Sequence, residues 1–306
     1  MTDTPANSTF ADLIQSDLFT FHIGAEKKAF VAHSHAIAAT SEPFRALVNG
    51  GLAESTTRCA ELDDVEPEDF VRFLEYAYRR NYTVPAWRPG ESVHASGDGV
   101  KGVPPAPPDE PALAPEYEPG PELEAVHPEV HAVAEWPSRL NKKFSKRGRK
   151  GLNDVTLRAR FQNCLYSTDE APDLALQEGY EPRTNLDMDQ DFTPVFLAHA
   201  RLYTFADMRL VYPLKALALD KLYKTLVAFQ LYTERMGDVV KLARYAYENG
   251  PDRSEAGEPN ELRKLVVEYI ACEVDTVGKN REFRALIEEG GKFVGDFWTI
   301  VSRYVL

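Results

Sequence analysis

The sequence predicts an α/β fold that a long insertion interrupts and that an all-α C-terminal extension follows. Three observations support this prediction. Residues 18–23 form an apolar, strand-like run, and short helical patterns come after it. Near Pro85 the composition changes abruptly, because proline and acidic residues accumulate there. From Phe192 onward, apolar residues recur at helical spacing.

Size and composition set the first limits on function. The chain has 306 residues, of which 43% are hydrophobic and 27% charged, so it can bury a sizeable core. Its net charge of −13 argues against direct binding to nucleic acid, since the phosphate backbone favours a basic protein face. No long apolar run is present, so we expect neither a membrane span nor a secretory signal. Three widely spaced cysteines fit a reducing compartment, and we expect a cytoplasmic or nuclear location, or both.

The first strand is followed by a regular series of short elements. The segment from Phe30 to Phe44 places His33 between a second extended run and an apolar helix pattern, and Gly50-Gly51 form a turn behind it. A strand is expected to end at Glu61–Asp63. The next helix carries its apolar residues on one face, namely Phe70, Phe73, Leu74, Ala77 and Tyr78.

The insertion is rich in proline and acid. Between Pro85 and Pro137 lie twelve of the 21 prolines, and residues 102–138 contain eight acidic residues but no lysine or arginine. Such a segment buries too little apolar surface to offset the entropy cost of ordering it. We therefore expect the insertion to be partly disordered, and we favour a passive spacer over a dedicated binding motif.

A basic run follows the acidic segment. It holds six positive charges in nine residues: Lys142, Lys143, Lys146, Arg147, Arg149 and Lys150. A nuclear-import signal or a patch for an acidic partner is one interpretation. Loose pairing with the acidic segment before it is the other.

Beyond the basic run, Val155, Leu157, Ala159 and Phe161 alternate with polar residues, which predicts one exposed strand. The C-terminal part is instead periodic at three and four residues. We expect about five helices there, with apolar faces within residues 195–206, 214–226, 239–246, 262–270 and 283–287.

Taken together, the N-terminal residues resemble a BTB/POZ domain, a fold with helices around a small sheet. The resemblance rests on Ser16-Asp17 before the first strand, on the order Phe30, His33, Ile37, Ser41, Phe44, on Gly50-Gly51 with Glu54-Ser55, and on the ending at Tyr82. The next helices of the family resemble a segment that starts only at Phe196. We therefore expect residues 10–86 to be the N-terminal part of the domain, 87–191 the insertion, 192–229 the remaining helices and 230–306 a helical extension. The extension resembles the C-terminal helices of fungal BTB proteins of unassigned function.

The resemblance implies a protein–protein interaction module that self-associates and recruits a partner protein. Its N-terminal segment, with Phe10, Leu13 and Leu18, is the candidate homodimer interface, although these side chains could equally cover the core of their own chain. The segment with Asp64, Glu66, Glu68 and Phe70 lies where adaptor-type BTB domains meet a cullin. A substrate adaptor of a cullin-type ubiquitin ligase is thus one alternative, and a nuclear, transcription-linked scaffold is another.

No set of residues indicates catalysis, a metal or a cofactor. His33 and His35 are closely spaced, but a metal site needs three or four converging ligands. The resemblance makes His33 a structural residue at a strand-to-helix junction. Gly290-Gly291-Lys292 lacks the spacing of a phosphate-binding loop. We therefore expect no enzyme activity and no bound cofactor.

Overall fold

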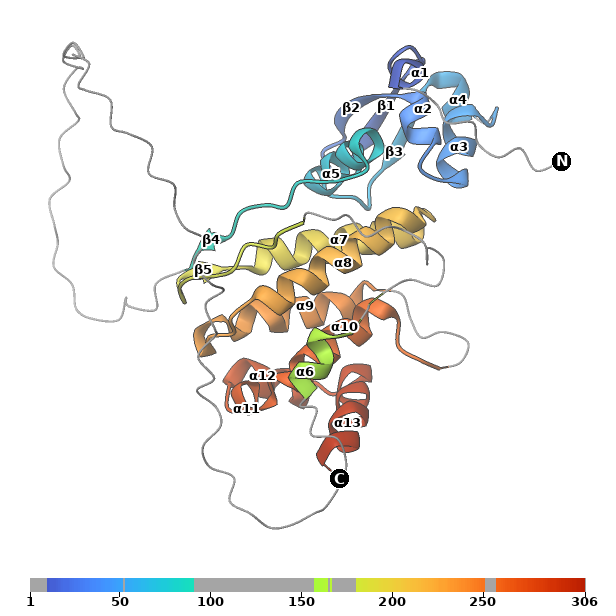
Figure 1. Ribbon diagram of the computed structural model, residues 1–306. Coiled ribbons are helices and arrows are strands. Elements are labelled where there is room, and N and C mark those ends of the chain that lie inside the picture. Colours follow the sequence, from blue (N-terminus) through green and yellow to red (C-terminus); the bar gives the residue numbers. More distant parts are fainter. Residues whose placement is uncertain are drawn as a thin grey trace, which may run out of the picture. The chain divides into compact units, whose positions relative to one another are not determined.

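The fold was analysed in a computed structural model (Figure 1). The structure describes residues 10–51, 53–90, 157–164, 166, 180–250 and 257–305. Two compact units divide the chain: residues 1–92 with 155–306 form one, and residues 93–154 form the other. All described residues belong to the first unit, so the predicted acidic segment and the basic run lie outside the description.

A three-stranded sheet forms the N-terminal part of the fold (Figure 1). The strands are β1 (Leu18–Ile23), β2 (Lys28–His33) and β3 (Cys59–Leu62). β1 is central: it pairs antiparallel with β2, with Phe21 opposite Phe30, and parallel with β3, with Phe21 opposite Ala60. Because side chains alternate along β1, Phe19, Phe21 and Ile23 are buried while Leu18 points outward.

Helices cover one face of this sheet. They are α1 (Phe10–Ile14), α2 (Ser34–Ala38), α3 (Glu42–Asn49), α4 (Ala53–Thr57) and α5 (Pro67–Arg79). Two of them begin with clear N-terminal signals: the Ser41 hydroxyl accepts a hydrogen bond from the Phe44 amide of α3, and Pro67 opens α5. The apolar face of α5 packs on the sheet through Phe70, whose ring centroid lies 5.1 Å from that of Phe21.

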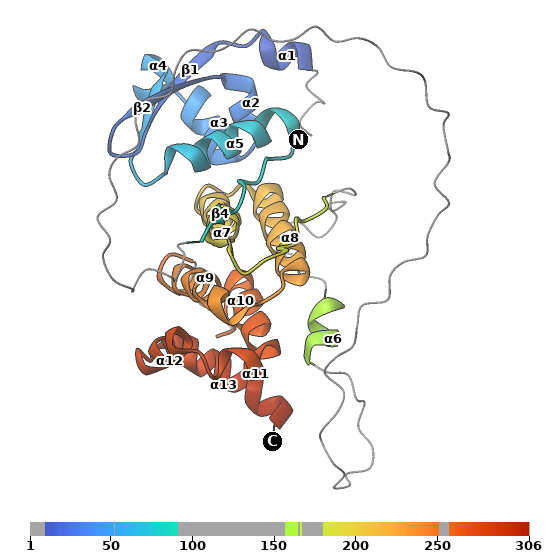
Figure 2. The ribbon, with the colours of Figure 1, turned by 90° about the vertical axis from the view of Figure 1, so that its left-hand side faces the viewer.

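Two long antiparallel helices complete this core. They are α7 (Thr193–Met208) and α8 (Tyr212–Ala228), which run side by side and follow the short strand pair β4 (Arg88–Pro89) and β5 (Gln190–Asp191) (Figures 1 and 2). Phe205 of α7 lies against Phe73 of α5, with ring centroids 4.9 Å apart, and Phe73 stacks on Phe44 at 4.8 Å. The core therefore joins residues that lie more than a hundred positions apart in the sequence.

Further helices extend the fold from α7 and α8. They are η1 (Thr233–Arg235), α9 (Met236–Glu248), α10 (Glu261–Cys272), α11 (Val274–Val277), α12 (Arg281–Glu288) and α13 (Lys292–Val305). Helix α9 packs on α7, and α10 packs on α9 and α13. The α/β fold class, with a small sheet, covering helices and an all-helical C-terminal region, is confirmed.

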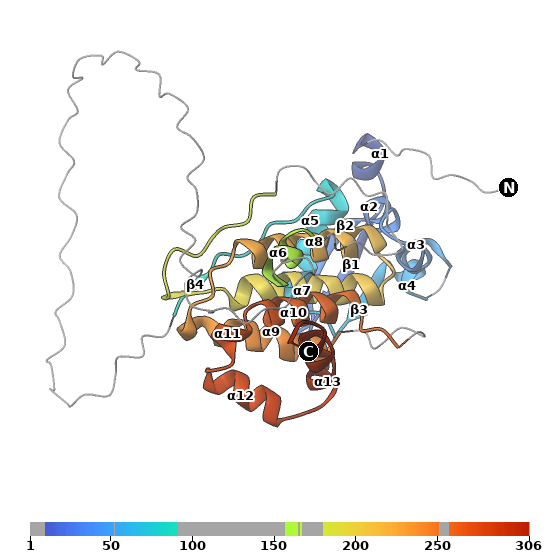
Figure 3. The ribbon, with the colours of Figure 1, turned by 60° about the horizontal axis from the view of Figure 1, so that its bottom comes forward.

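Two predictions about single elements are wrong. The expected strand after the basic run is a helix, α6 (Leu157–Gln162), which packs on α10 (Figure 3). Its residues include leucine, arginine, alanine and glutamine, which all favour a helix, and four alternating positions are too few to outweigh that preference. The C-terminal region also holds seven α-helices among its described residues instead of about five, because α11 and α13 were not expected.

Candidate interaction surfaces

Four large apolar side chains on α1, β1 and β2 are exposed, namely Phe10, Ile14, Leu18 and Val31. We call this set the N-terminal apolar surface. Phe10 and Ile14 are four residues apart and share a helix face. Leu18 pairs with His33 and Val31 with Thr20, which makes Leu18 and Val31 diagonal neighbours on the outer face of the sheet.

The predicted dimer residues divide between this surface and the core. Phe10 is 65% exposed and Leu18 56%, so both side chains are available to a partner. Leu13 is only 8% exposed and packs with the core of its own chain. For Leu13 the alternative, that it covers the core of its own chain, holds, because the helix turns this residue inward between the two exposed positions.

The segment before α5 forms an acidic edge, which we define as Asp64, Glu66 and Glu68. All three side chains are exposed. Asp64 accepts two hydrogen bonds from Arg209 Nη2, at 2.9 and 3.0 Å, which ties the edge to the end of α7. Glu66 and Glu68 precede or begin α5, where negative charge is favoured by the helix dipole.

Phe70 does not belong to this edge. Its side chain is fully buried, with its ring centroid 5.5 Å from that of Phe30 and 5.7 Å from that of Phe73. Phe70 was predicted to contact a partner, and that prediction is wrong. The residue lies on the apolar face of α5 with Phe73 and Ala77, and this face is directed into the core.

A groove of about 300 Å³ adjoins the acidic edge and was not foreseen. It contains Asp64 and Glu66 together with Asp69, and α7 and α9 supply its other wall through Arg201, Thr204, Phe205, Met208, Tyr245 and Asn249. Asp69 is buried and accepts from Arg72 at 2.6 Å. Burial raises the pKa of Asp69 to about 6, although Arg72 and Arg201 limit the rise. No local pattern near Asp64 indicates that a helix 130 residues later would complete this groove.

A buried polar network joins the end of the N-terminal part to α7 and α8. Tyr82 Oη lies 2.6 Å from Nδ1 of His199, a fully buried residue of α7. Thr225 of α8 lies 3.0 Å from the Tyr180 hydroxyl and 3.5 Å from His199 Nε2. Burial, with the charges of Lys221 and Arg72, lowers the pKa of His199 to about 3, so its imidazole is neutral. The network links three parts of the fold and shows no nucleophile or exposed acid–base pair.

His33 lies where it was expected, at the junction of β2 and α2. Its amide donates to the Tyr78 hydroxyl at 2.9 Å, and Nδ1 lies at the same distance from that oxygen. His35 is exposed on α2. Across the described ranges no three metal-ligating side chains cluster. Nor does any described helix reach the length and hydropathy that crossing a bilayer requires. The predicted nuclear-import run lies outside the described residues.

Comparison with known families gives a match for the N-terminal part of the chain. Residues 10–94 match the model of the BTB/POZ domain. No curated protein and no solved structure gave a significant match. The resemblance of the C-terminal helices to fungal proteins therefore stays a prediction. Over residues 10–94 the family match and the sheet with its covering helices agree, and this part of the chain is similar to a BTB/POZ domain, a protein–protein interaction module.

Proposed function

We propose that this protein is a self-associating interaction module that uses its N-terminal apolar surface to bind a second copy of itself. The observation that carries the proposal is the exposure of four large apolar side chains on three elements that are consecutive in the chain, α1, β1 and β2. Contiguous exposed apolar residues cost free energy in water and mark interaction sites in folded proteins. The family match supports the same class of function, because BTB/POZ domains bind other protein chains.

Sedimentation of the full chain at micromolar concentration tests this proposal. The wild type should sediment as a dimer, and Phe10→Asp combined with Leu18→Asp should sediment as a monomer, because a charge in an apolar interface loses its hydration. Trp298→Asp is the matched control, since Trp298 is a similarly exposed aromatic residue on a different helix, α13. A monomeric wild type, or a double variant that stays dimeric, would refute the proposal.

A second candidate is recruitment of a cullin, for which the exposed acidic edge is the supporting observation. Negative charge on a rim chiefly accelerates and orients binding to a basic partner. We expect Glu66→Lys with Glu68→Lys to weaken capture of a purified cullin N-terminal domain, whereas Glu288→Lys on α12 leaves it unchanged. Phe70 is unsuitable for this test because its loss would damage the core. Absence of capture by the wild type rejects the candidate.

We also propose that the chain resides in the cytoplasm, the nucleus or both, with the basic run at 142–150 acting in nuclear import if it enters the nucleus. The support is the density of positive charge, six residues in nine. A fluorescent fusion of the full chain should lose nuclear signal when Lys142, Lys143, Lys146 and Arg147 become alanine. An unchanged distribution would remove the import role and the scaffold function that depends on it.

A further inference from the structure

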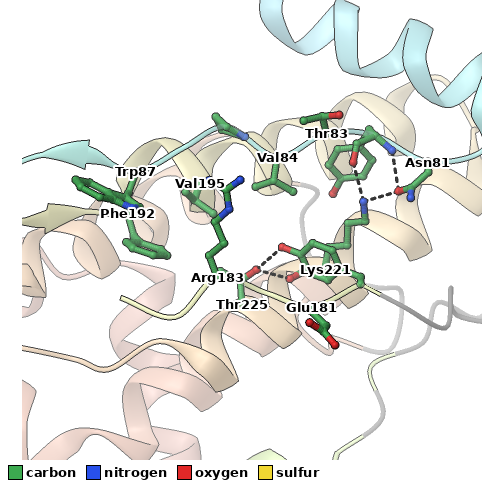
Figure 4. A pocket seen from close by; sticks show the side chains of 13 residues that line it. Asn81, Thr83, Val84, Trp87, Glu181, Arg183, Phe192, Val195, Lys221 and Thr225 are labelled. Atoms are coloured by element: carbon green, nitrogen blue, oxygen red, sulfur yellow. Dashed lines mark hydrogen bonds between the residues drawn. The ribbon is translucent and has the colours of Figure 1, made fainter. Parts of the chain in front are cut away.

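A cavity of about 240 Å³ lies beside the buried polar network and takes no part in either interaction surface (Figure 4). Its walls come from the extended segment 81–87, from segment 180–183 and from helices α7 and α8. Such a volume holds a ligand about as large as one aromatic amino acid, at the small end of protein binding pockets.

A buried cation forms one wall of the cavity. Lys221 of α8 is only 1% exposed. Its ammonium donates to Asn81 Oδ1 at 2.5 Å and to the Tyr82 carbonyl at 2.8 Å, and it lies 4.0 Å from the centre of the Tyr82 ring. Within the described part of the chain no carboxylate lies within ion-pair distance of it. Neutral oxygens accept from two of its donors, and the carboxylates of Glu75 and Asp220 act on its charge only from beyond ion-pair distance. A buried charge without a direct ion pair is costly.

A second cation stands at the mouth. Arg183 lines the cavity, is exposed, and forms no ion pair with any described residue. Figure 4 shows the Arg183 guanidinium and the Lys221 ammonium both directed toward the extended segment 81–87, while the Glu181 carboxylate points away from them. Both positive charges of the cavity therefore face the same space, and the Glu181 carboxylate does not neutralise them there.

The remaining walls are apolar and aromatic. Trp87 and Phe192 lie together at one end, with Val195 next to them, and Val84 lies between the two cations in this view (Figure 4). The Tyr180 ring completes the wall at the other end, with its centre 4.9 Å from the Lys221 ammonium. A flat apolar group fits against such walls, because aromatic side chains offer large faces for stacking.

We propose that this cavity binds a small anion with an aromatic body, such as an aryl phosphate or aryl carboxylate. The anionic group would pair with Lys221 and Arg183, and the ring would lie between Trp87, Phe192 and Val195. Among the described residues, the Lys221 ammonium has a third donor without a hydrogen bond, and the Arg183 guanidinium has no ion pair, so both can bind the charged group. The apolar walls supply a slot for the ring.

Titration of the full-length protein tests the site. Phenyl phosphate and phenylacetate should bind saturably by calorimetry and should shift the indole N–H resonance of Trp87, assigned by its absence in Trp87→Phe. Phenylacetamide, the neutral analogue of phenylacetate, should bind at least about tenfold more weakly, since hydrogen bonds to charged groups are worth at least this factor. The two anions together distinguish a phosphate site from a carboxylate site.

Variants tie binding to the named residues. Arg183→Glu should weaken both anions by about tenfold or more, and because Arg183 is exposed the fold should be unaffected. Arg284→Glu makes the same charge change on an exposed residue of α12 and should leave binding unchanged. Lys221→Met, checked for folding by its melting curve, should abolish the preference for the anion over phenylacetamide. Equal affinity for the neutral analogue, unchanged binding by Arg183→Glu, or no saturation by either anion at about 10 mM would overturn the proposal.

Discussion

At the scale of single residues, the burial of His199 links the stability of the fold to pH. The unfolded chain protonates a histidine near pH 6.5, whereas the folded chain keeps His199 neutral until about pH 3. Between these values the unfolded state binds more protons. Stability contributed by the neutral imidazole is therefore present above about pH 6.5 and is lost as the pH falls through this window.

His199→Gln isolates this effect. The amide can still hydrogen-bond to Tyr82 but does not titrate. The free energy of unfolding of the wild type, measured with urea, should fall more steeply than that of the variant from pH 7 to 4, with a limiting difference of about 1.4 kcal/mol per pH unit. Burial raises the pKa of Asp69 to about 6 and that of Asp238 to about 7. These two carboxyl groups raise the free energy of unfolding as the pH falls, which opposes the effect of His199, but they do so equally in the wild type and the variant. A difference that stays constant with pH would contradict this account.

Local residue patterns indicate local structure in this fold. For Phe70 the local pattern indicated burial, although the residue was predicted to contact a partner. Ser41 caps the N-terminus of α3, as a serine before an apolar helix pattern indicates. His33 ends β2, and its amide donates a hydrogen bond to the Tyr78 hydroxyl. Phe70 shares a three-four face with Phe73 and Ala77, so its periodicity already predicted a buried side chain. The contact between Tyr82 and His199 spans 117 positions, and nothing local to either residue indicates it.

At the scale of elements, α6 packs on the rest of the fold through the ring of Phe161. Phe161 is buried, and its ring centroid lies 5.4 Å from that of Tyr223 on α8 and 5.7 Å from that of Tyr269 on α10. A six-residue helix is not stable alone, so these contacts hold it in place. The alternating pattern predicted an exposed strand here, so it missed both the helix and the burial of Phe161.

Phe161→Ala should release α6 without unfolding the rest of the chain. Removing a buried phenylalanine costs about 3–5 kcal/mol, and the weakest-held element opens first. Cys164 follows α6 and packs against the core, so its reaction with a thiol reagent should accelerate by at least about tenfold. Cys59, on β3, serves as the reference thiol within the same chain, and Gln162→Ala as the matched exposed substitution. Equal acceleration at both thiols would mean global unfolding instead.

The spacing of apolar residues predicts most of the C-terminal helices. Apolar faces predicted α7 to α10 and α12, because a repeat of three and four residues needs no distant partner to be recognised. Helix α13 carries the same signal in Phe293, Phe297 and Val301, all buried. The apolar faces expected from the sequence stop at residue 287, before this helix begins. Gly290 and Gly291 both have positive φ, 74° and 85°, and they turn the chain from α12 into α13.

At the scale of the whole molecule, the core is shared across the insertion. Phe44 and Phe73 from the family-matched part pack on Phe205, and Lys221 donates to Asn81. Arg209, which follows α7, forms an ion pair with Asp64 of the family-matched part. The part that matches the BTB/POZ model therefore leaves large apolar side chains uncovered if α7 and α8 are absent. The order of the helices and strands could be predicted from local sequence patterns. These contacts across the insertion could not, because they depend on how distant segments pack in three dimensions.

Two shortened chains test whether folding requires α7 and α8 and whether it requires residues 93–154. Residues 1–94 alone should show no cooperative unfolding, because the rings of Phe44 and Phe73 lose Phe205 as their cover. A chain in which a flexible linker of about 20 residues replaces 93–154 should keep a free energy of unfolding within about 1 kcal/mol of the wild type, since loop-closure entropy changes slowly with loop length. Urea unfolding followed by circular dichroism measures both. Cooperative folding of residues 1–94 would show that α7 and α8 are an addition to a finished domain, and collapse of the linker chain would give 93–154 a structural role.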